Sequence, residues 1–159
     1  MVSRKILGLK ALVSAVKKDK KAGFKIVFTN GCFDILHVGH VRYLKSARKL
    51  GDKLILGLNS DASVRKLKGK DRPVVSQAER AELLSEFPFI DYIVVFGEDT
   101  PYRVIKSVLP DVLVKGGDWA PEKIIGSDVV LANGGNVKSL PYVKGRSTTN
   151  IIKKILKNL

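Results

Sequence analysis

The chain contains only two histidines, and they stand three residues apart, at positions 37 and 40. Apolar residues continue from His40 at helical spacing, so His37 and His40 should share one face at a helix start. Imidazoles beside a helix N-terminus can contact an anion, and Gly39 removes a side chain that would block a phosphate. The pair therefore predicts a phosphate site. A zinc site and an ordinary surface helix start are the alternatives.

A second candidate is the basic stretch at residues 65–73, which contains a single glycine. Such a stretch can close over a polyphosphate, and a solvated loop is an equal alternative. Lys68 is the first candidate for phosphate contact, and Lys66, Lys70 and Arg72 are its substitutes.

Two further segments have residue types that suit phosphate or nucleotide. Residues 115–118 place Lys115 and Asp118 around two glycines, which allow close backbone approach. Ser147, Thr148 and Thr149 offer hydroxyls and free amides at a helix start. A tight turn and simple helix capping are the respective alternatives.

These candidates follow predicted strands of a parallel sheet. Short apolar runs alternate with helical periodicity, which is typical of an α/β fold with helices on both faces. The expected strands are 25–30, 53–59, 91–96, 111–115 and 136–142. The expected helices are 3–22, 40–50, 76–87, 100–109, 121–125 and 147–159, and 60–75 is expected to be a loop. Ligands bind beyond the carboxyl ends of such strands. The segments that follow these ends have residue types suited to nucleotide binding, except the turn at residues 97–99.

Length and composition favour one domain over residues 1–159, with an amphipathic helix at 1–22. The longest apolar runs are far shorter than a membrane span, and no secretory signal is visible. One cysteine excludes an internal disulfide framework and favours a reducing, cytoplasmic location.

The net charge of +14 favours polyanionic partners. Nucleic acid is one such partner, but aromatic residues make up only 7% of the chain and form no stacking set. The paired histidines also have no role in that hypothesis. We therefore expect a phosphorylated small molecule, and no stable complex with nucleic acid or membrane.

At this point the sequence resembles a known family. Residues 31–40 match the signature of the cytidylyltransferase-like nucleotidyltransferases, and residues 147–149 match their second motif. Secondary matches resemble the branch that adenylylates a heptose phosphate in ADP-heptose synthesis. They comprise residues 29–40, 59–61, 67–69, 72–74, 98–101, 113–118, 132–135 and 147–154.

The resemblance implies a Rossmann-like nucleotidyltransferase fold. It also implies transfer of an adenylyl group from ATP, with Mg²⁺, to D-glycero-β-D-manno-heptose 1-phosphate, giving ADP-heptose and pyrophosphate for lipopolysaccharide core or another surface glycan. Other phosphorylated acceptors (glycerol 3-phosphate, ethanolamine phosphate or FMN) are the alternative. The glycerol-phosphate cytidylyltransferase branch usually has an arginine where this chain has Tyr142, which weakens transfer from CTP.

The same resemblance implies partners. The unit is often fused behind a ribokinase-like sugar kinase, and no such domain is found in these 159 residues. A separate heptose kinase would then supply the sugar 1-phosphate. A homodimer or larger assembly is also expected.

Within that family, roles follow for the candidate residues. The catalytic residues would be His37, His40 and Lys68. Nucleotide-binding residues would be Asn30, Gly31, Phe33, Gly39, Lys115, Asp118, Ser147, Thr148 and Thr149. Weaker candidates for substrate or phosphate are Asn59, Asp61, Arg72 and Arg80, and Asp34 is the one candidate magnesium ligand.

Overall fold

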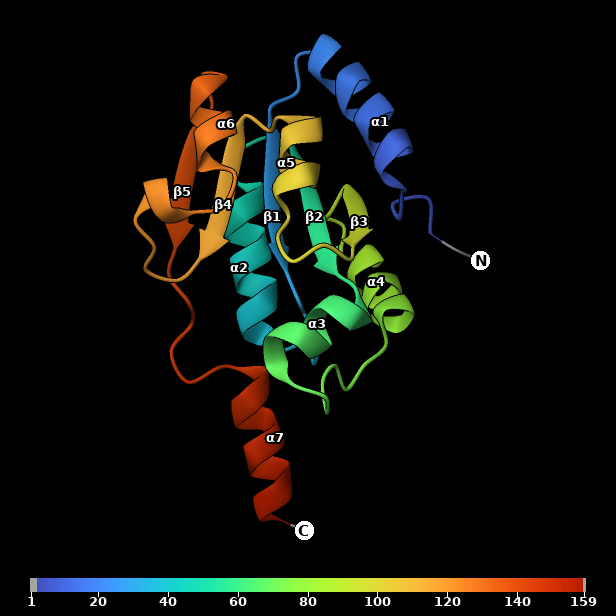
Figure 1. Cartoon of the computed structure of the whole chain (residues 1–159), viewed down its shortest axis with the longest axis vertical. Helices are drawn as coiled ribbons and strands as arrows, with labels where there is room; N and C mark the ends of the chain where they lie inside the picture. Colours follow the sequence, from blue (N-terminus) through green and yellow to red (C-terminus); the bar gives the residue numbers. More distant parts are fainter. Residues whose placement is uncertain (1–2, 159) are drawn as a thin grey trace.

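The computed structural model describes residues 3–158, and its centre is one sheet of five parallel strands (Figure 1). The strands are β1 (Ile26–Gly31), β2 (Lys53–Asn59), β3 (Tyr92–Phe96), β4 (Val112–Gly116) and β5 (Asn136–Leu140). Their order is β3-β2-β1-β4-β5, so the chain builds outward from β1 in one direction and then in the other. The predicted fold is confirmed, and the reversal between β1 and β4 creates a switch point at which such folds bind ligands.

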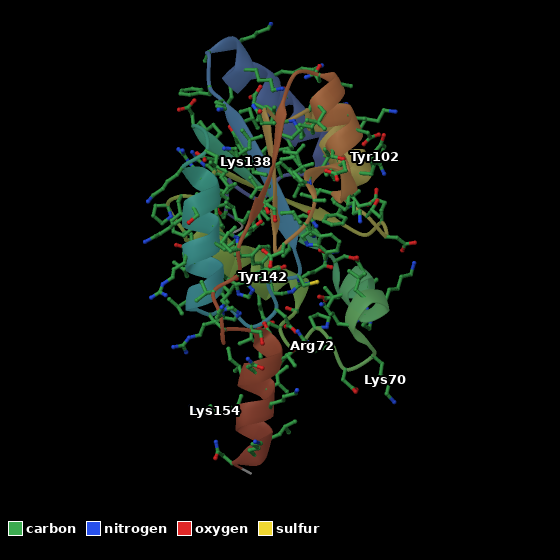
Figure 2. The ribbon with its side chains drawn as sticks, turned by 90° about the vertical axis from the view of Figure 1, so that its left-hand side faces the viewer. Lys70, Arg72, Tyr102, Lys138, Tyr142 and Lys154 are labelled. Atoms are coloured by element: carbon green, nitrogen blue, oxygen red, sulfur yellow. The ribbon has the colours of Figure 1, made fainter. Side chains whose placement is uncertain are left out.

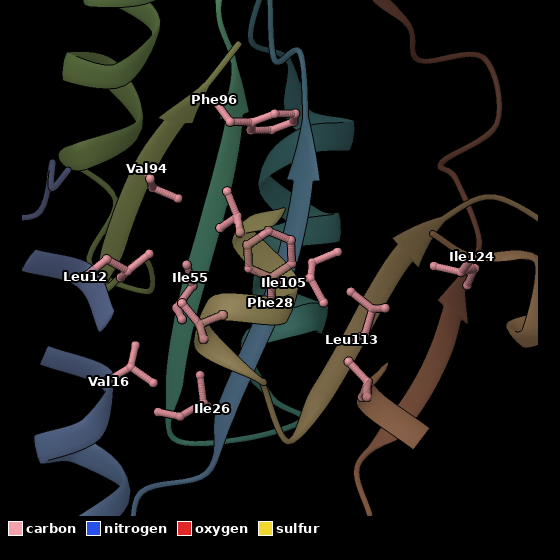
Figure 3. Packing of buried hydrophobic residues seen from close by; sticks show 13 residues of the cluster. Leu12, Val16, Ile26, Phe28, Ile55, Val94, Phe96, Ile105, Leu113 and Ile124 are labelled. Atoms are coloured by element: carbon pink, nitrogen blue, oxygen red, sulfur yellow. The ribbon is translucent and has the colours of Figure 1, made fainter. Parts of the chain in front are cut away.

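One face of the sheet is covered by α1 (Leu9–Lys21), α5 (Tyr102–Val108) and α6 (Ser127–Ala132). Leu12 and Ile105 from these helices pack against Ile26 and Phe28 of β1 (Figure 3). Successive strand residues point to opposite faces, so a strand buried on both faces must be apolar throughout. This requirement explains the uninterrupted apolar runs in the sequence.

The other face is covered by α2 (Val38–Arg48) and α4 (Gln77–Ser85). Leu44 and Leu84 from these helices pack in a cluster with Val27 and Leu56 of the sheet. The predicted capping box at Ser76 begins α4 and is confirmed. The start of α2 is therefore held in place by a buried helix body, which matters because His37 and His40 lie there.

Two helices lie beyond the carboxyl ends of the strands: α3 (Asp61–Lys68) and α7 (Thr148–Lys157) (Figure 1). The prediction of a loop throughout 60–75 is wrong, because Ser60 caps α3 by accepting a hydrogen bond from the Ser63 amide, and Val64 is buried. Between β4 and β5 the predicted turn is present as η1 (Pro121–Lys123), whereas α6 was not predicted.

The prediction of a helix over 1–22 is wrong for residues 3–8, since α1 begins at Leu9, and its residues 1–2 lie outside the described part of the chain. The Leu7 amide donates to the Ile93 carbonyl (2.9 Å), and the Ile93 amide donates to the Lys5 carbonyl (2.8 Å). Ile6 therefore lies along the outer edge of β3. Apolar residues at this spacing fit a helix face, but here the unpaired strand edge supplies backbone partners.

The opposite edge strand, β5, is more exposed than the others, and Lys138 lies at its centre (Figure 2). β5 ends at Leu140, before the predicted end at 142, and Pro141 follows. Within residues 3–158, none of the helices is long and apolar enough to cross a membrane.

Candidate active site

A cavity of about 730 Å³ opens at the carboxyl ends of β1 and β4, beside the switch point. It brings together residues from seven separate stretches of the chain, including both sequence motifs. The predicted site residues in its lining are Asn30, Gly31, Phe33, Asp34, His37, Gly39, His40, Asn59, Lys68, Arg72, Lys115, Ser147, Thr148 and Thr149.

His37 and His40 form a stacked pair in the cavity wall, with ring centroids 3.9 Å apart and planes inclined by 23°. His37 is the N-cap of α2, and its Nδ1 accepts a hydrogen bond from the Gly39 amide (3.1 Å). Nδ1 is thus unprotonated in the neutral ring, and Nε2 carries the proton. The His37 ring is therefore fixed as a hydrogen-bond donor through Nε2.

Phe33 packs against this pair. Its ring lies 5.1 Å from the His40 ring, at 57°. A Cβ added to Gly31 would lie 2.7 Å from Phe33 Cε2, so a glycine is needed for the ring to pack there. Phe33 itself has a left-handed backbone (φ 45°), which costs energy in a non-glycine residue and is common at functional sites.

Burial keeps both imidazoles neutral near pH 7. Burial and the proximity of His37 lower the pKa of His40 from 6.5 to about 4. Burial and the charge of Arg146 lower the pKa of His37. The buried His40 Nδ1 has no hydrogen-bond partner among residues 3–158. The pair is therefore arranged as neutral polar groups facing a cavity with surplus positive charge.

The lowered pKa of His40 predicts a pH-dependent stability. As the pH is lowered from about 6.5 to about 4, the unfolded chain takes up a proton at His40 and the folded chain does not. The free energy of unfolding should therefore fall as the pH is lowered through this range. The contribution disappears in His40→Gln, which has no titrating ring. Urea unfolding at about pH 7 and about pH 5 measures the difference. Equal losses of stability in wild type and variant would contradict the pKa assigned to His40.

Lysines and an arginine also line the cavity. Lys68, the last residue of α3, lines the cavity together with Arg72. Lys66 is instead paired with Asp99 (2.9 Å) at an exposed position, and Lys70 is exposed outside the lining. The structure thus favours Lys68 and Arg72 over the other two candidate cations. Burial also lowers the pKa of the cavity residue Lys115.

The C-terminal motif is joined to the first motif. The Thr148 hydroxyl donates to the Ile35 carbonyl (3.2 Å), across 113 residues of sequence. Ser147 caps α7 by accepting from the Asn150 amide (3.1 Å). The first amides of a helix have no intrahelical acceptor, so those of Thr148 and Thr149 are available to an anion in the cavity.

Three predicted contact residues lie outside the cavity lining: Arg80, Asp61 and Asp118. Arg80 is fully buried, and its guanidinium donates to the carbonyls of Val75, Cys32 and Asn59 and pairs with Asp61 (2.8 Å). The prediction that Arg80 and Asp61 contact substrate is therefore corrected. They connect the ends of β1 and β2 to α3 and α4.

The carboxylate of Asp34 is engaged by the protein itself. It accepts hydrogen bonds from the amides of Val74 and Val75 and pairs with Arg72, so no oxygen faces outward for a metal. The hypothesis of a magnesium ligand at Asp34 is corrected on this ground. Within residues 3–158, no cluster of three or more His, Cys, Asp or Glu side chains could hold a metal ion, zinc included.

Several cavity residues were not among the predicted site residues. Arg146 lies close to Gly39, since its Cβ is 3.3 Å from the Cβ position of that glycine. Tyr142 packs over Gly116 and is 67% exposed (Figure 2). Asp99 also reaches the lining, although residues 97–99 were expected to be a plain turn. Arg146 directly precedes the Ser147–Thr149 motif and Asp99 lies within the matched residues 98–101, so proximity to these matches is the signal that could have found them.

Comparison with known proteins shows which family the chain is similar to. The cytidylyltransferase-like family profile matches residues 28–154. The chain is 58% identical over 153 residues to the bifunctional protein HldE of Geobacter metallireducens, and 57% identical over 139 residues to that of Haemophilus ducreyi. These matches cover 96% and 87% of this chain but only 31% and 29% of the relatives, so it spans about a third of their length.

Two solved structures share the fold. A lipopolysaccharide core biosynthesis protein from Thermoplasma volcanium is 31% identical, with a TM-score of 0.61 over 78% of this chain and all of that one. Pantothenate synthetase from Thermus thermophilus has the same TM-score over 92% of this chain and 67% of that one, at 14% identity. From the family profile, together with the first of these structures, the chain belongs to the cytidylyltransferase-like family of nucleotidyltransferases.

Proposed function

We propose that this chain transfers the adenylyl group of ATP to D-glycero-β-D-manno-heptose 1-phosphate, giving ADP-heptose and pyrophosphate. One observation carries the proposal: the stacked histidines and the Ser147–Thr149 motif line the same cavity, together with Lys68, Arg72 and Lys115. The motif matches to the heptose branch, and the 58% identity to a bifunctional HldE protein, support the choice of acceptor.

In the proposed reaction an oxygen of the sugar phosphate attacks the α-phosphorus of ATP. The bond from that phosphorus to the bridging oxygen breaks, and pyrophosphate leaves with the electron pair. A phosphate monoester has a second pKa near 6, so the nucleophile is largely ionised at neutral pH and needs no general base. The protein must therefore bring two polyanions together and stabilise charge on the phosphoryl oxygens.

The site has groups for both tasks. His37 Nε2–H and His40 would donate hydrogen bonds to the triphosphate, and the first amides of α7 would hold its terminal phosphates. Lys68, at the end of α3, would approach the reacting phosphates. Lys115, with Asn30 and Gly31, would line the nucleotide pocket.

Mg²⁺ would enter as part of the nucleotide substrate. The ion commonly keeps several waters and binds phosphate oxygens directly, so it needs few protein ligands. This agrees with the engaged carboxylate of Asp34.

Gly39→Ala tests the geometry of the histidine pair. The added Cβ would lie 2.8 Å from His37 Cε1 and 2.9 Å from its Nδ1, so the ring must move. We expect turnover to fall by roughly 10–10², because small displacements of catalytic groups are costly. The helix propensity gained by alanine should offset the loss of the His37 cap, so the free energy of unfolding should change by less than about 1 kcal/mol.

Gly8→Ala is the matched control for this variant, because nothing lies within 4 Å of the added Cβ. Its turnover and Tm should equal those of the wild type. Full activity in Gly39→Ala would mean that the position of the His37 ring does not matter to the reaction.

The proposed function is tested by pyrophosphate release. ATP and CTP are each supplied with heptose 1-phosphate, glycerol 3-phosphate, ethanolamine phosphate and FMN. We expect the highest kcat/KM for ATP with heptose 1-phosphate. A preference for another acceptor, or for CTP, would retain the nucleotidyltransferase chemistry and replace the substrate pair.

Partners and location follow from the same proposal. The chain spans about a third of its bifunctional relatives, and we propose that a heptose kinase, as a separate chain or fused unit, supplies the sugar phosphate. A homodimer or larger assembly and a cytoplasmic location, where ATP is available, are also proposed. Light scattering of the purified chain measures the assembly.

A further inference from the structure

Asp34 is a buried carboxylate of the first motif, and it contacts the segment after α3. Its side chain is 1% exposed, and one oxygen lies 2.6 Å from Arg72 Nε. The amides of Val74 and Val75 donate to its other oxygen, each at 2.9 Å. These bonds join two segments about 40 residues apart in the sequence.

The bond from Nε fixes how the Arg72 guanidinium is presented. Arg72 lines the cavity, and its side chain is 17% exposed. Nη1 and Nη2 have no hydrogen-bond partner in residues 3–158, whereas Nε is used by Asp34. Four N–H donors of a planar group therefore remain available, and such a fork suits the oxygens of a phosphate.

Fixing a long side chain in advance has a functional benefit. A free arginine loses rotamer entropy when it becomes ordered, and an arginine held by a carboxylate has already lost much of that entropy. A buried ion pair contributes little to stability compared with apolar residues of similar volume. The pair is thus better explained by the orientation of Arg72 than by stability alone.

We propose that Asp34 is a positioning residue that holds Arg72 ready to bind the phosphate of the sugar phosphate acceptor. The inference rests on the proposed function. The acceptor is favoured over the triphosphate because the stacked histidines and the start of α7 already offer donors for the latter. Arg72 comes from a different segment of the chain, the one that follows α3.

The experiment compares Arg72→Ala, Asp34→Asn and the double variant. Asparagine retains an oxygen for the Val74 and Val75 amides, and it replaces the charged partner of Arg72. We expect Arg72→Ala to raise the KM for the acceptor by roughly 10–10²-fold, the usual effect of losing hydrogen bonds to a charged group. The KM for ATP should change less than about twofold, which is well under 1 kcal/mol.

Asp34→Asn should raise the same KM to a smaller extent, and the double variant should be no worse than Arg72→Ala. This non-additivity is expected when one residue acts through the other. Asp71→Asn, an exposed neighbouring carboxylate, is the matched control and should be unchanged. Additive effects, or an Asp34→Asn that lowers Tm without changing the acceptor KM, would overturn the inference.

Binding of inorganic phosphate, measured by titration calorimetry, provides a readout that does not need turnover. Wild type and Asp71→Asn should bind phosphate more tightly than Arg72→Ala and Asp34→Asn. If no acceptor is adenylylated but this order holds, the proposed function fails and the Asp34–Arg72 phosphate site remains. If all four proteins bind phosphate alike, the inference fails whatever the activity.

Discussion

His40→Ala should lower turnover by roughly 10²–10³, the effect of removing one donor that stabilises transition-state charge. The imidazole is stacked on His37 in the cavity wall, and its Nδ1 leaves no protein group unsatisfied when it is removed. The domain should therefore remain folded. Steady-state pyrophosphate release measures the loss, and circular dichroism with Tm checks the fold.

A His40→Ala enzyme with wild-type kcat would remove the histidine pair from the mechanism. An unfolded variant would be uninformative about chemistry, so His40→Gln serves as a second variant with a larger polar side chain. Both variants should raise KM for ATP less than they lower kcat, since the interaction is assigned to the transition state.

Arg80→Ala should be the most destabilising of the substitutions considered. Arg80 is 0% exposed, and its removal takes a donor from three carbonyls, one of them in a fully buried hydrogen bond, and leaves Asp61 without its cation. Removing one partner of a buried pair costs about 3–5 kcal/mol. For a domain of this size that corresponds to a drop in Tm of roughly 6–20 °C, measured by thermal unfolding.

Arg65→Ala is the matched control, because Arg65 lies on α3 and is exposed. Its effect should stay within about 0.5 kcal/mol, as for most surface substitutions. Equal Tm values for the two variants would show that the Arg80 hydrogen bonds contribute no net stability.

The sheet and most of the cavity could be predicted because their signals are local. Each strand is a short apolar run, and parallel strands bring their carboxyl ends to one edge, so segments such as 29–34 and 147–149 had to meet. The spacing of His37 and His40 likewise predicts that they share a helix face. Both predictions needed only neighbouring residues and one rule of topology.

The errors arose where a distant partner decides the outcome. Arg80 looks like a surface charge in its own helix, yet carbonyls at the ends of two strands require its donors. Asp34 suggests a metal ligand when the sequence is read locally, because its actual partner, Arg72, lies 38 residues away in the sequence. The helix at 61–68 was missed because its basic residues suggested a solvated loop, although Ser60 is a good N-cap.

The two margins of the sheet are protected by different means, and this limits how copies of the chain can associate. Residues 5–7 occupy the open side of β3, while Lys138 places a positive charge on β5 at the other margin. Charged or covered margins discourage sheets from joining through their backbones. Any assembly should therefore form by side-chain packing of helices and loops, leaving each sheet at five strands.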